Sequence, residues 1–416
     1  MATEGLPSLK SLRERSDDSN FQLQVPQCLS RFPATDALPI FPGGDVIVRS
    51  DLVDPPKQWQ FHSTGLVRQS TWFARDLHEQ QLTSTKTTDW YLYGIEEVDG
   101  QVKLSRRPAE GPRPITVQSQ NDNLLERTTV KREDDDSDAL YKTILHIYDQ
   151  IFKAFYGLPS LITPSNIQLA TSQAEQLVKV ATDLGCIHLV SSQIGNALLQ
   201  HRQTLYKAIL ADPPRYLLLS LVLENDFIYT ESLIHLIGAH PCYPWPTPHT
   251  TLPEHTKRLI ARKSLDLDIE VLRVERKLLL LTITTQRGTS YSPDQHSQFD
   301  TWFIVQYFRN TLTEVLREHD AAKPALKRGN FFRKIRSGRY MEYEQVRQQV
   351  QRIMPSAVDT LGEDLRILKE CASEIVEGMA RNEASLDVEE SKVGWLTCVK
   401  VEGKDIPWRA VAVSEA

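Results

Sequence analysis

Residues 44–78 read GDVIVRSDLVDPPKQWQFHSTGLVRQSTWFARDLH and contain two strand patterns followed by two helix patterns. Val46–Val48 is a short apolar run of the kind that forms a buried strand. A turn-forming stretch separates it from Gln58–His62, in which polar and aromatic side chains alternate. Ser63 and Ser70 are each placed to cap the start of a short helix. This part of the chain therefore predicts the order strand, strand, helix, helix.

A β-hairpin and a long polar segment are expected next. Trp90–Ile95 and Val102–Leu104 are β-prone runs on either side of Asp99–Gly100, a pair that favours a tight hairpin turn. Residues 106–138 contain several prolines and the run KREDDDSD, with almost nothing to bury, which predicts a disordered insertion. Residues 1–37 also lack an apolar period, and we expect a mobile tail there.

Helical patterns dominate the rest of the chain. Residues 140–155 carry apolar side chains at i, i+3, i+4 and i+7, the pattern of an amphipathic helix. Ser165 with Gln168 predicts a capping box for the next helix, which Gly185 is placed to end. A series of helices is expected after residue 200, including a long one from Glu254 to about Ile283.

The order of these elements resembles the BTB (also called POZ) domain. The usual pattern of that family has a DV strand, an F-x-x-H-K-x-x-L step and an S-x-x-F helix. This chain offers Asp45-Val46, then Phe61-His62-Ser63 with Leu66, then Ser70-Thr71-Trp72-Phe73. The phrase AFYG and the helix pattern NIQLATSQAEQLVKVATDLGC are similar to the second half of the domain. The resemblance covers about residues 38–200 and implies an α/β (α+β) fold there.

The helical region resembles the part that follows the BTB domain in fungal members of the family. The phrases RQTLYKAI, PPRYLLLS and FIYTESLIHLIG carry this likeness. It implies a mainly α-helical domain over residues 201–390. The last segment, residues 391–416, is similar to the strand ending of the same group and implies a short β-hairpin.

The resemblance implies a non-enzymatic protein-interaction module, acting as a scaffold or regulator, with transcription as one setting. It implies protein partners, including a second copy of the chain in a homodimer. An alternative is a substrate adaptor of a cullin-type ubiquitin ligase, although no glutamate follows Leu158–Ile162, where such adaptors commonly carry one. The candidate core and interaction residues are Asp45, Phe61, His62, Leu66, Val67, Trp72 and Phe73.

Composition and charge are typical of a globular protein. Of the 416 residues, 40% are hydrophobic and 25% are charged, and the net charge of −6 provides no overall attraction to nucleic acid or anionic membranes. The apolar runs are far shorter than a bilayer span, and the first residues lack a secretory-signal pattern. Five scattered cysteines indicate a reducing compartment. We therefore expect an intracellular protein of the cytoplasm or nucleus, without a membrane partner.

A metal site is the main alternative chemistry. Five side chains of the types that bind zinc lie close together in sequence: His235, His240, Cys242, His249 and His255. Their spacing matches no compact zinc finger, and we expect solvated loop histidines, with no metal and no cofactor. Motifs of hydrolases, nucleotide-binding enzymes and metalloproteases are absent from the sequence, so we expect no enzyme. A metal-dependent enzyme built on this cluster is the remote alternative.

A basic run is the second candidate site. Its cations are Lys327, Arg328, Arg333, Lys334, Arg336 and Arg339, with Phe331 and Phe332 between them. Basic residues interleaved with aromatics are typical of a nucleic-acid surface or a nuclear-import signal, and a solvated helix end is the simpler interpretation. Because the whole molecule is acidic, we expect no nucleic-acid partner.

Overall fold

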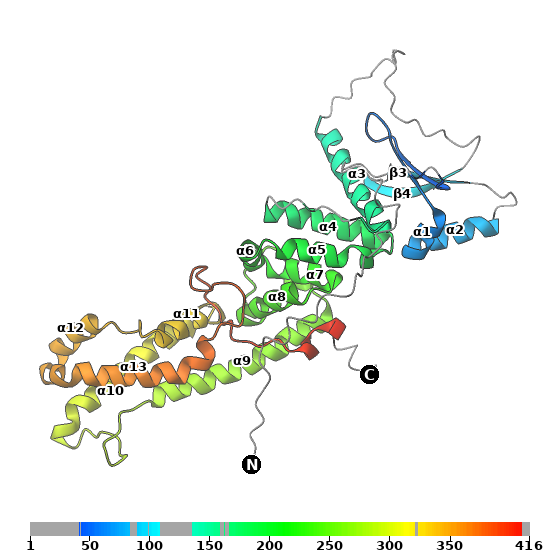
Figure 1. The fold of residues 1–416 in the computed structure, drawn as a ribbon. Helices are drawn as coiled ribbons and strands as arrows, with labels where there is room; N and C mark the ends of the chain where they lie inside the picture. The colour runs from blue at the N-terminus through cyan, green and yellow to red at the C-terminus, as the bar shows by residue number, and fades with distance from the viewer. Residues whose placement is uncertain are drawn as a thin grey trace, which may run out of the picture. The chain divides into compact units, whose positions relative to one another are not determined.

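The computed structural model describes residues 41, 43–83, 90–98, 100–108, 135–158, 162, 166–320 and 323–409 (Figure 1). The predicted mobile tail and residues 109–134 of the predicted insertion lie outside this part of the chain. Arg106 and Arg107 belong to a strand and residues 135–138 to a helix, so the prediction of disorder is wrong at these two ends of the insertion. The chain forms two compact units. The first comprises the described residues of Met1–Ser63 and Lys86–Thr129, and the second those of Thr64–Thr85 and Val130–Ala416.

The first unit is a four-stranded sheet in the order β2-β1-β3-β4. Its strands are β1 (Val46–Ser50), β2 (Lys57–Phe61), β3 (Tyr91–Val98) and β4 (Gln101–Arg107). β1 is antiparallel to β2 and parallel to β3, and β3 is antiparallel to β4. The predicted strands and hairpin are therefore confirmed, and Gly100 adopts the positive φ of 73° that its tight turn requires.

The end of β2 is buried on both faces, which the alternating pattern did not indicate. Phe61 pairs with Val46 in the register of the sheet, and Gln60 pairs with Ile47. The Gln60 side chain is buried because its amide donates a 2.8 Å hydrogen bond to the Gly44 carbonyl. A polar side chain can be buried at low cost when it is hydrogen-bonded in this way.

The second unit is helical. Its first part contains α1 (Ser63–Gln69, whose first residue belongs to the first unit), α2 (Thr71–Thr83), α3 (Asp135–Phe155), α4 (Ile167–Asp183), η2 (Ile187–Leu189), α5 (Ser191–Leu199), α6 (Gln203–Ala211), α7 (Pro213–Leu223) and α8 (Asp226–Ala239). Gly185 ends α4 with a φ of 62°, as predicted. The observed cap of α4 is Asn166, whose side chain accepts from the Gln168 backbone N–H, so the predicted capping box is wrong; Ser165 lies outside the described residues.

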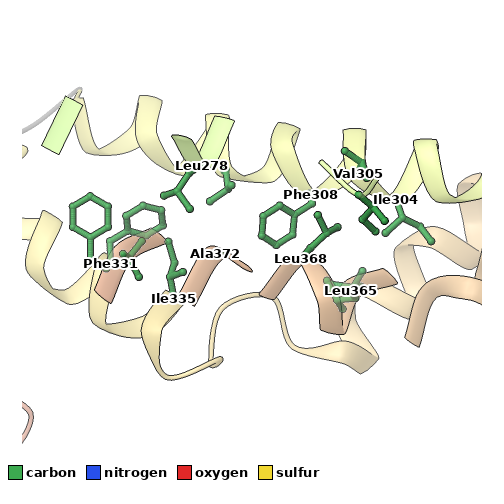
Figure 2. Close-up of a cluster of buried hydrophobic side chains, with 14 of the residues drawn as sticks. Leu278, Ile304, Val305, Phe308, Phe331, Ile335, Leu365, Leu368 and Ala372 are labelled. Atoms are coloured by element: carbon green, nitrogen blue, oxygen red, sulfur yellow. The ribbon is translucent and has the colours of Figure 1, made fainter. Parts of the chain in front are cut away.

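A long helix and a small bundle form the remainder of the second unit. Its elements are η3 (His249–Thr251), α9 (Glu254–Leu280), η4 (His296–Gln298), α10 (Phe299–Asp320), α11 (Ala325–Arg336), α12 (Tyr343–Ile353), η5 (Pro355–Ala357), α13 (Val358–Ala380) and η6 (Gly403–Asp405). The predicted helix beginning at Glu254 is confirmed. Figure 2 shows how Leu278 of α9, Phe308 of α10, Phe331 of α11 and Leu368 of α13 meet between the helices. Burial of this apolar surface is the main force holding the bundle.

Residues 381–409, here called the C-terminal segment, contain no strand, so the predicted β-hairpin is wrong within the described part of the ending. Two glycines bring the segment into close contact with helices. A Cβ atom on Gly238 of α8 would lie 1.9 Å from the Leu396 carbonyl oxygen, and one on Gly329 of α11 would lie 1.9 Å from that of Trp395. The extended segment therefore packs on helices instead of pairing with another strand.

Among the described residues, no helix is both long enough and apolar enough to cross a bilayer.

We expect Gly329→Ala to destabilise the protein by about 1–3 kcal/mol, because the added methyl group must displace the Trp395 backbone. The matched control is Gly378→Ala in α13, where a Cβ atom meets nothing within 4 Å. That change should stabilise by about 0.5–1 kcal/mol, as alanine does in an open helical position. Chemical denaturation of both variants provides the measurement, and equal free energies of unfolding would contradict the close contact.

Candidate protein-interaction surface

The carboxylate of Asp45 binds Ser63 within the first unit. One of its oxygens accepts a 2.7 Å hydrogen bond from the Ser63 backbone N–H, and the other accepts a 2.6 Å bond from the Ser63 hydroxyl. Ser63 therefore acts as a donor to Asp45 and is not the cap that the sequence predicted. The half-buried ring of His62 lies 5.6 Å from that of Phe41 between centroids. Asp45 thus has a structural role.

The apolar residues predicted around α1 and α2 divide into core and surface. Phe61, Leu66 and Phe73 are fully buried, whereas Trp72 is half-buried and Val67 is 41% exposed. The Phe73 ring packs edge-on to Phe155, with 6.2 Å between centroids. Among the described side chains of these two helices, Val67 is the large apolar residue that is exposed. The short helices turn their apolar stripe inward, since a helix in a folded domain buries that stripe first.

The start of α2 is joined to the end of α4. The Ser70 hydroxyl accepts from the Phe73 N–H at 3.2 Å, which confirms the predicted cap, and lies 2.6 Å from the Leu184 carbonyl oxygen, to which it donates. Gly185 comes so close to Thr71 that an added Cβ atom would lie 1.9 Å from the threonine hydroxyl oxygen. This region is consequently a tight packing contact and offers no free binding surface.

The predicted zinc-type residues are distributed over separate contacts. His235 is fully buried in α8, where its Nδ1 lies 3.2 Å from the Trp395 indole Nε1 and its Nε2 lies 3.5 Å from the Glu231 carboxylate. His240 Nδ1 is 2.7 Å from the Tyr243 hydroxyl, and His249 stacks on the Tyr243 ring. The expectation of solvated loop histidines is therefore wrong for His235.

The same side chains do not converge on one point. Cys242 is partly buried and His255 is exposed at the start of α9. Within the described ranges, no group of three or more His, Cys, Asp or Glu residues is arranged to hold a metal ion. The stretch that the sequence singled out is thus part of the packing around α8.

The basic run forms α11 and the turn after it, and its arginines are engaged with the protein itself. Arg328 pairs with Asp268 at 2.7 Å, Arg336 donates to Ser373 at 2.9 Å, and Arg339 pairs with Glu389 at 3.0 Å. Phe331 and Phe332 are buried, so neither can stack on a base. Lys327 and Lys334 are the exposed lysines of the run. Because the arginines of the predicted patch are paired and its aromatic rings are buried, these contacts disfavour a nucleic-acid surface.

Three buried charged groups hold the C-terminal segment. Arg333 donates to the backbone carbonyls of Val393 and Trp395, and burial lowers the pKa of its guanidinium. The Glu231 carboxylate accepts from the backbone N–H groups of Ser385 and Leu386, at 2.6 and 3.1 Å. These contacts join residues 60 to 155 positions apart. The sequence did not indicate them, because residues so far apart in the chain form no local pattern.

The third group is the carboxylate of Asp405, a residue of the same segment whose side chain is fully buried. Its carboxylate lies 2.6 Å from the Lys263 ammonium and accepts a 2.8 Å bond from the Glu402 backbone N–H. Burial alone would raise the pKa of Asp405, but the hydrogen bonds from Lys263 and the Glu402 backbone outweigh it and lower the pKa. Asp405 is therefore a charged anchor between α9 and the C-terminal segment.

An exposed apolar stripe runs along α9, on the side away from the core. Its members, here called the α9 stripe, are exposed by 62%, 42%, 62% and 63% in the order Leu265, Ile269, Leu272 and Leu280. The first three follow the spacing i, i+4, i+7 that aligns side chains on one helix face. Leu280 lies about two turns further along that face.

The α9 stripe is distinct from the buried face of the same helix. Ile260, Val271, Val274 and Leu278 are buried on the opposite side, where α9 packs against α8, α10 and α13. The other exposed large apolar side chains of the described residues occur one or two to an element. Single exposed apolar residues are normal, whereas an aligned set indicates a binding surface. The sequence predicted the helix, and the i, i+4, i+7 spacing of Leu265, Ile269 and Leu272 was the signal that could have shown this second face.

Comparison with protein-family models, with curated proteins and with solved structures finds no match for this chain.

We expect Phe73→Ala to lower the free energy of unfolding by about 3–5 kcal/mol, because it removes a fully buried ring from a packed core. Val67→Ala on the neighbouring helix, at an exposed position, should change it by less than about 0.5 kcal/mol. Urea denaturation followed by circular dichroism gives both values. Similar small effects for the two variants would contradict the placement of Phe73 in the core.

We expect Asp405→Asn to destabilise the protein near neutral pH more than in acid. The folded-state pKa of Asp405 is lowered, so its contribution to stability is present above the ordinary aspartate pKa and is lost as the pH falls through the folded value. The difference in Tm between the native protein and the variant should shrink below about pH 4. Asp183→Asn, at an exposed position in α4, is the control, and a pH-independent difference for Asp405→Asn would contradict the assignment.

Proposed function

We propose that this chain is a non-enzymatic interaction protein and that it binds a helix of another protein chain through the α9 stripe. The observation that carries the proposal is the second apolar face of α9, which remains exposed although the opposite face of the helix is buried. Water contact with three aligned leucines and an isoleucine is unfavourable, and covering them with a partner removes that apolar surface from water.

The spacing of the α9 stripe favours a helical partner. Side chains at i, i+4 and i+7 form the seam by which one helix packs on another. Exposed charged side chains of both signs, among them Glu270, Arg273 and Lys277, border the stripe. An apolar centre with a charged rim is the usual anatomy of a protein-interaction site.

We further infer that residues 38–200 are a BTB-type interaction module, as the sequence resemblance implies. The element order β1-β2-α1-α2-β3-β4-α3-α4 and the strand order β2-β1-β3-β4 support this inference. The aspartate of the DV strand, Asp45, has a structural role, because its carboxylate accepts two hydrogen bonds from Ser63. A module of this type would make the protein a scaffold or regulator with two separate binding regions.

The contacts of the buried charged side chains support a non-enzymatic role. Glu231 and Arg333 bind backbone groups of the C-terminal segment, and Asp405 binds Lys263. Buried charges in an enzyme site are commonly aimed at an open cleft, where their perturbed pKa values serve the reaction. Here each of the three is directed to a neighbouring part of the chain, and its contacts stabilise the fold.

Affinity purification of the full chain from its native cells, followed by mass spectrometry, tests this function. Leu272→Glu should reduce recovery of the principal partner by about tenfold or more, because it places a charge at the centre of the apolar surface. Leu169→Glu, at an exposed leucine of α4, is the matched control and should leave recovery unchanged. Recovery of a cullin would identify the adaptor role, and equal recovery with both variants would contradict the proposed surface.

A further inference from the structure

We propose that the partner helix of the α9 stripe is α9 of a second copy of this chain, bound in the antiparallel direction. This inference rests on the proposed function and names its partner. The pairing joins identical surfaces about a twofold axis, the commonest symmetry of homodimers.

The charge pattern beside the α9 stripe is the evidence for the direction. Asp266, Glu270, Arg273 and Lys277 follow the spacing i, i+4, i+7, i+11 and therefore form one line along the helix. The side chains along this line are exposed. Their charges read negative, negative, positive, positive toward the C-terminus. In a parallel twofold pair the two lines would lie on opposite sides of the contact and would not meet, whereas in an antiparallel pair they lie on the same side and each charge faces its complement.

The same pattern fixes the crossing point. Glu270 with Arg273, and Asp266 with Lys277, are both symmetric about the midpoint between Val271 and Leu272. A twofold axis at that point brings Glu270 opposite Arg273 of the second copy, and Asp266 opposite Lys277 of the second copy. Leu272 then lies beside the axis, at the centre of the apolar contact.

Asp266 and Lys277 distinguish an intermolecular pair from one within the chain. Glu270 and Arg273 already form an exposed ion pair within α9, which a second copy can share. Asp266 and Lys277 are separated by about 16 Å along the helix axis, so they cannot meet within one chain. An ion pair between Asp266 and Lys277 can therefore form only between two copies of the chain.

Arg276 lies on the same helix face as the α9 stripe, between Leu272 and Leu280, and interrupts its apolar character. The same crossing places it beside Asp268 of the second copy. Asp268 pairs with Arg328 at 2.7 Å in its own chain and is half exposed, so one of its sides stays open to a second cation. The long aliphatic part of Arg276 covers neighbouring apolar surface while its charged end reaches the rim.

The test measures the dissociation constant of the full chain by sedimentation at tens of micromolar and below. We expect a dimer that Leu272→Glu converts to monomer and that Leu169→Glu leaves intact. Asp266→Lys and Lys277→Asp should each raise the dissociation constant by tenfold or more. The double variant carrying both changes should restore the native value, because the antiparallel pairs are re-formed with their signs reversed.

Two results would overturn the inference. One is a native chain that is monomeric throughout this range, and the other is a dimer that neither single charge reversal weakens, as in a parallel pair. A monomer that still loses its principal cellular partner on Leu272→Glu would overturn the second copy as the partner and leave the proposed function standing. Circular dichroism on each variant checks that the exposed substitutions leave the fold intact.

Discussion

The helical region depends on how the C-terminal segment is held against α8 and α11. This segment contributes Leu396 to the core of the bundle, Val399 to the cluster around α8, and Val393 to a third cluster. An extended segment that pairs with no strand must find hydrogen-bond partners for its backbone elsewhere. Arg333 and Glu231 supply several of them, and the absence of a side chain on Gly329 allows the close approach.

Charged side chains in this region act as structural groups because each meets an opposite charge or an oriented backbone dipole. A buried charge without such partners would cost several kcal/mol. The Glu231 carboxylate faces two backbone N–H groups, and the Asp405 carboxylate faces the Lys263 ammonium. The polar contacts thereby select one path for the C-terminal segment across surfaces that hydrophobic burial alone would leave interchangeable.

The inner and outer faces of α9 have different roles because the helix is fixed along its length. Lys263 donates to the Lys400 carbonyl and pairs with Asp405, and Arg309 donates to the Leu281 carbonyl just beyond the end of the helix. Such anchors prevent the helix from rotating to hide its second apolar face. The fixed helix thus keeps Leu265, Ile269 and Leu272 exposed, and in the proposed dimer the charge order beside them determines the direction of the partner.

The sequence by itself determined the local features: the hairpin at Gly100, the end of α4 at Gly185, the cap at Ser70 and the long helix from Glu254. These depend on backbone preferences and side chains within a few residues. The tertiary structure alone decided that Gln60 and His235 are buried, that the arginines of α11 are paired, and that the ending packs on helices without forming a hairpin. Each of these outcomes depends on partners far away in the chain. The spacing of apolar residues in the sequence predicts that α9 is a helix with apolar faces. Only the packing of α8, α10 and α13 against it decides which face remains in contact with water.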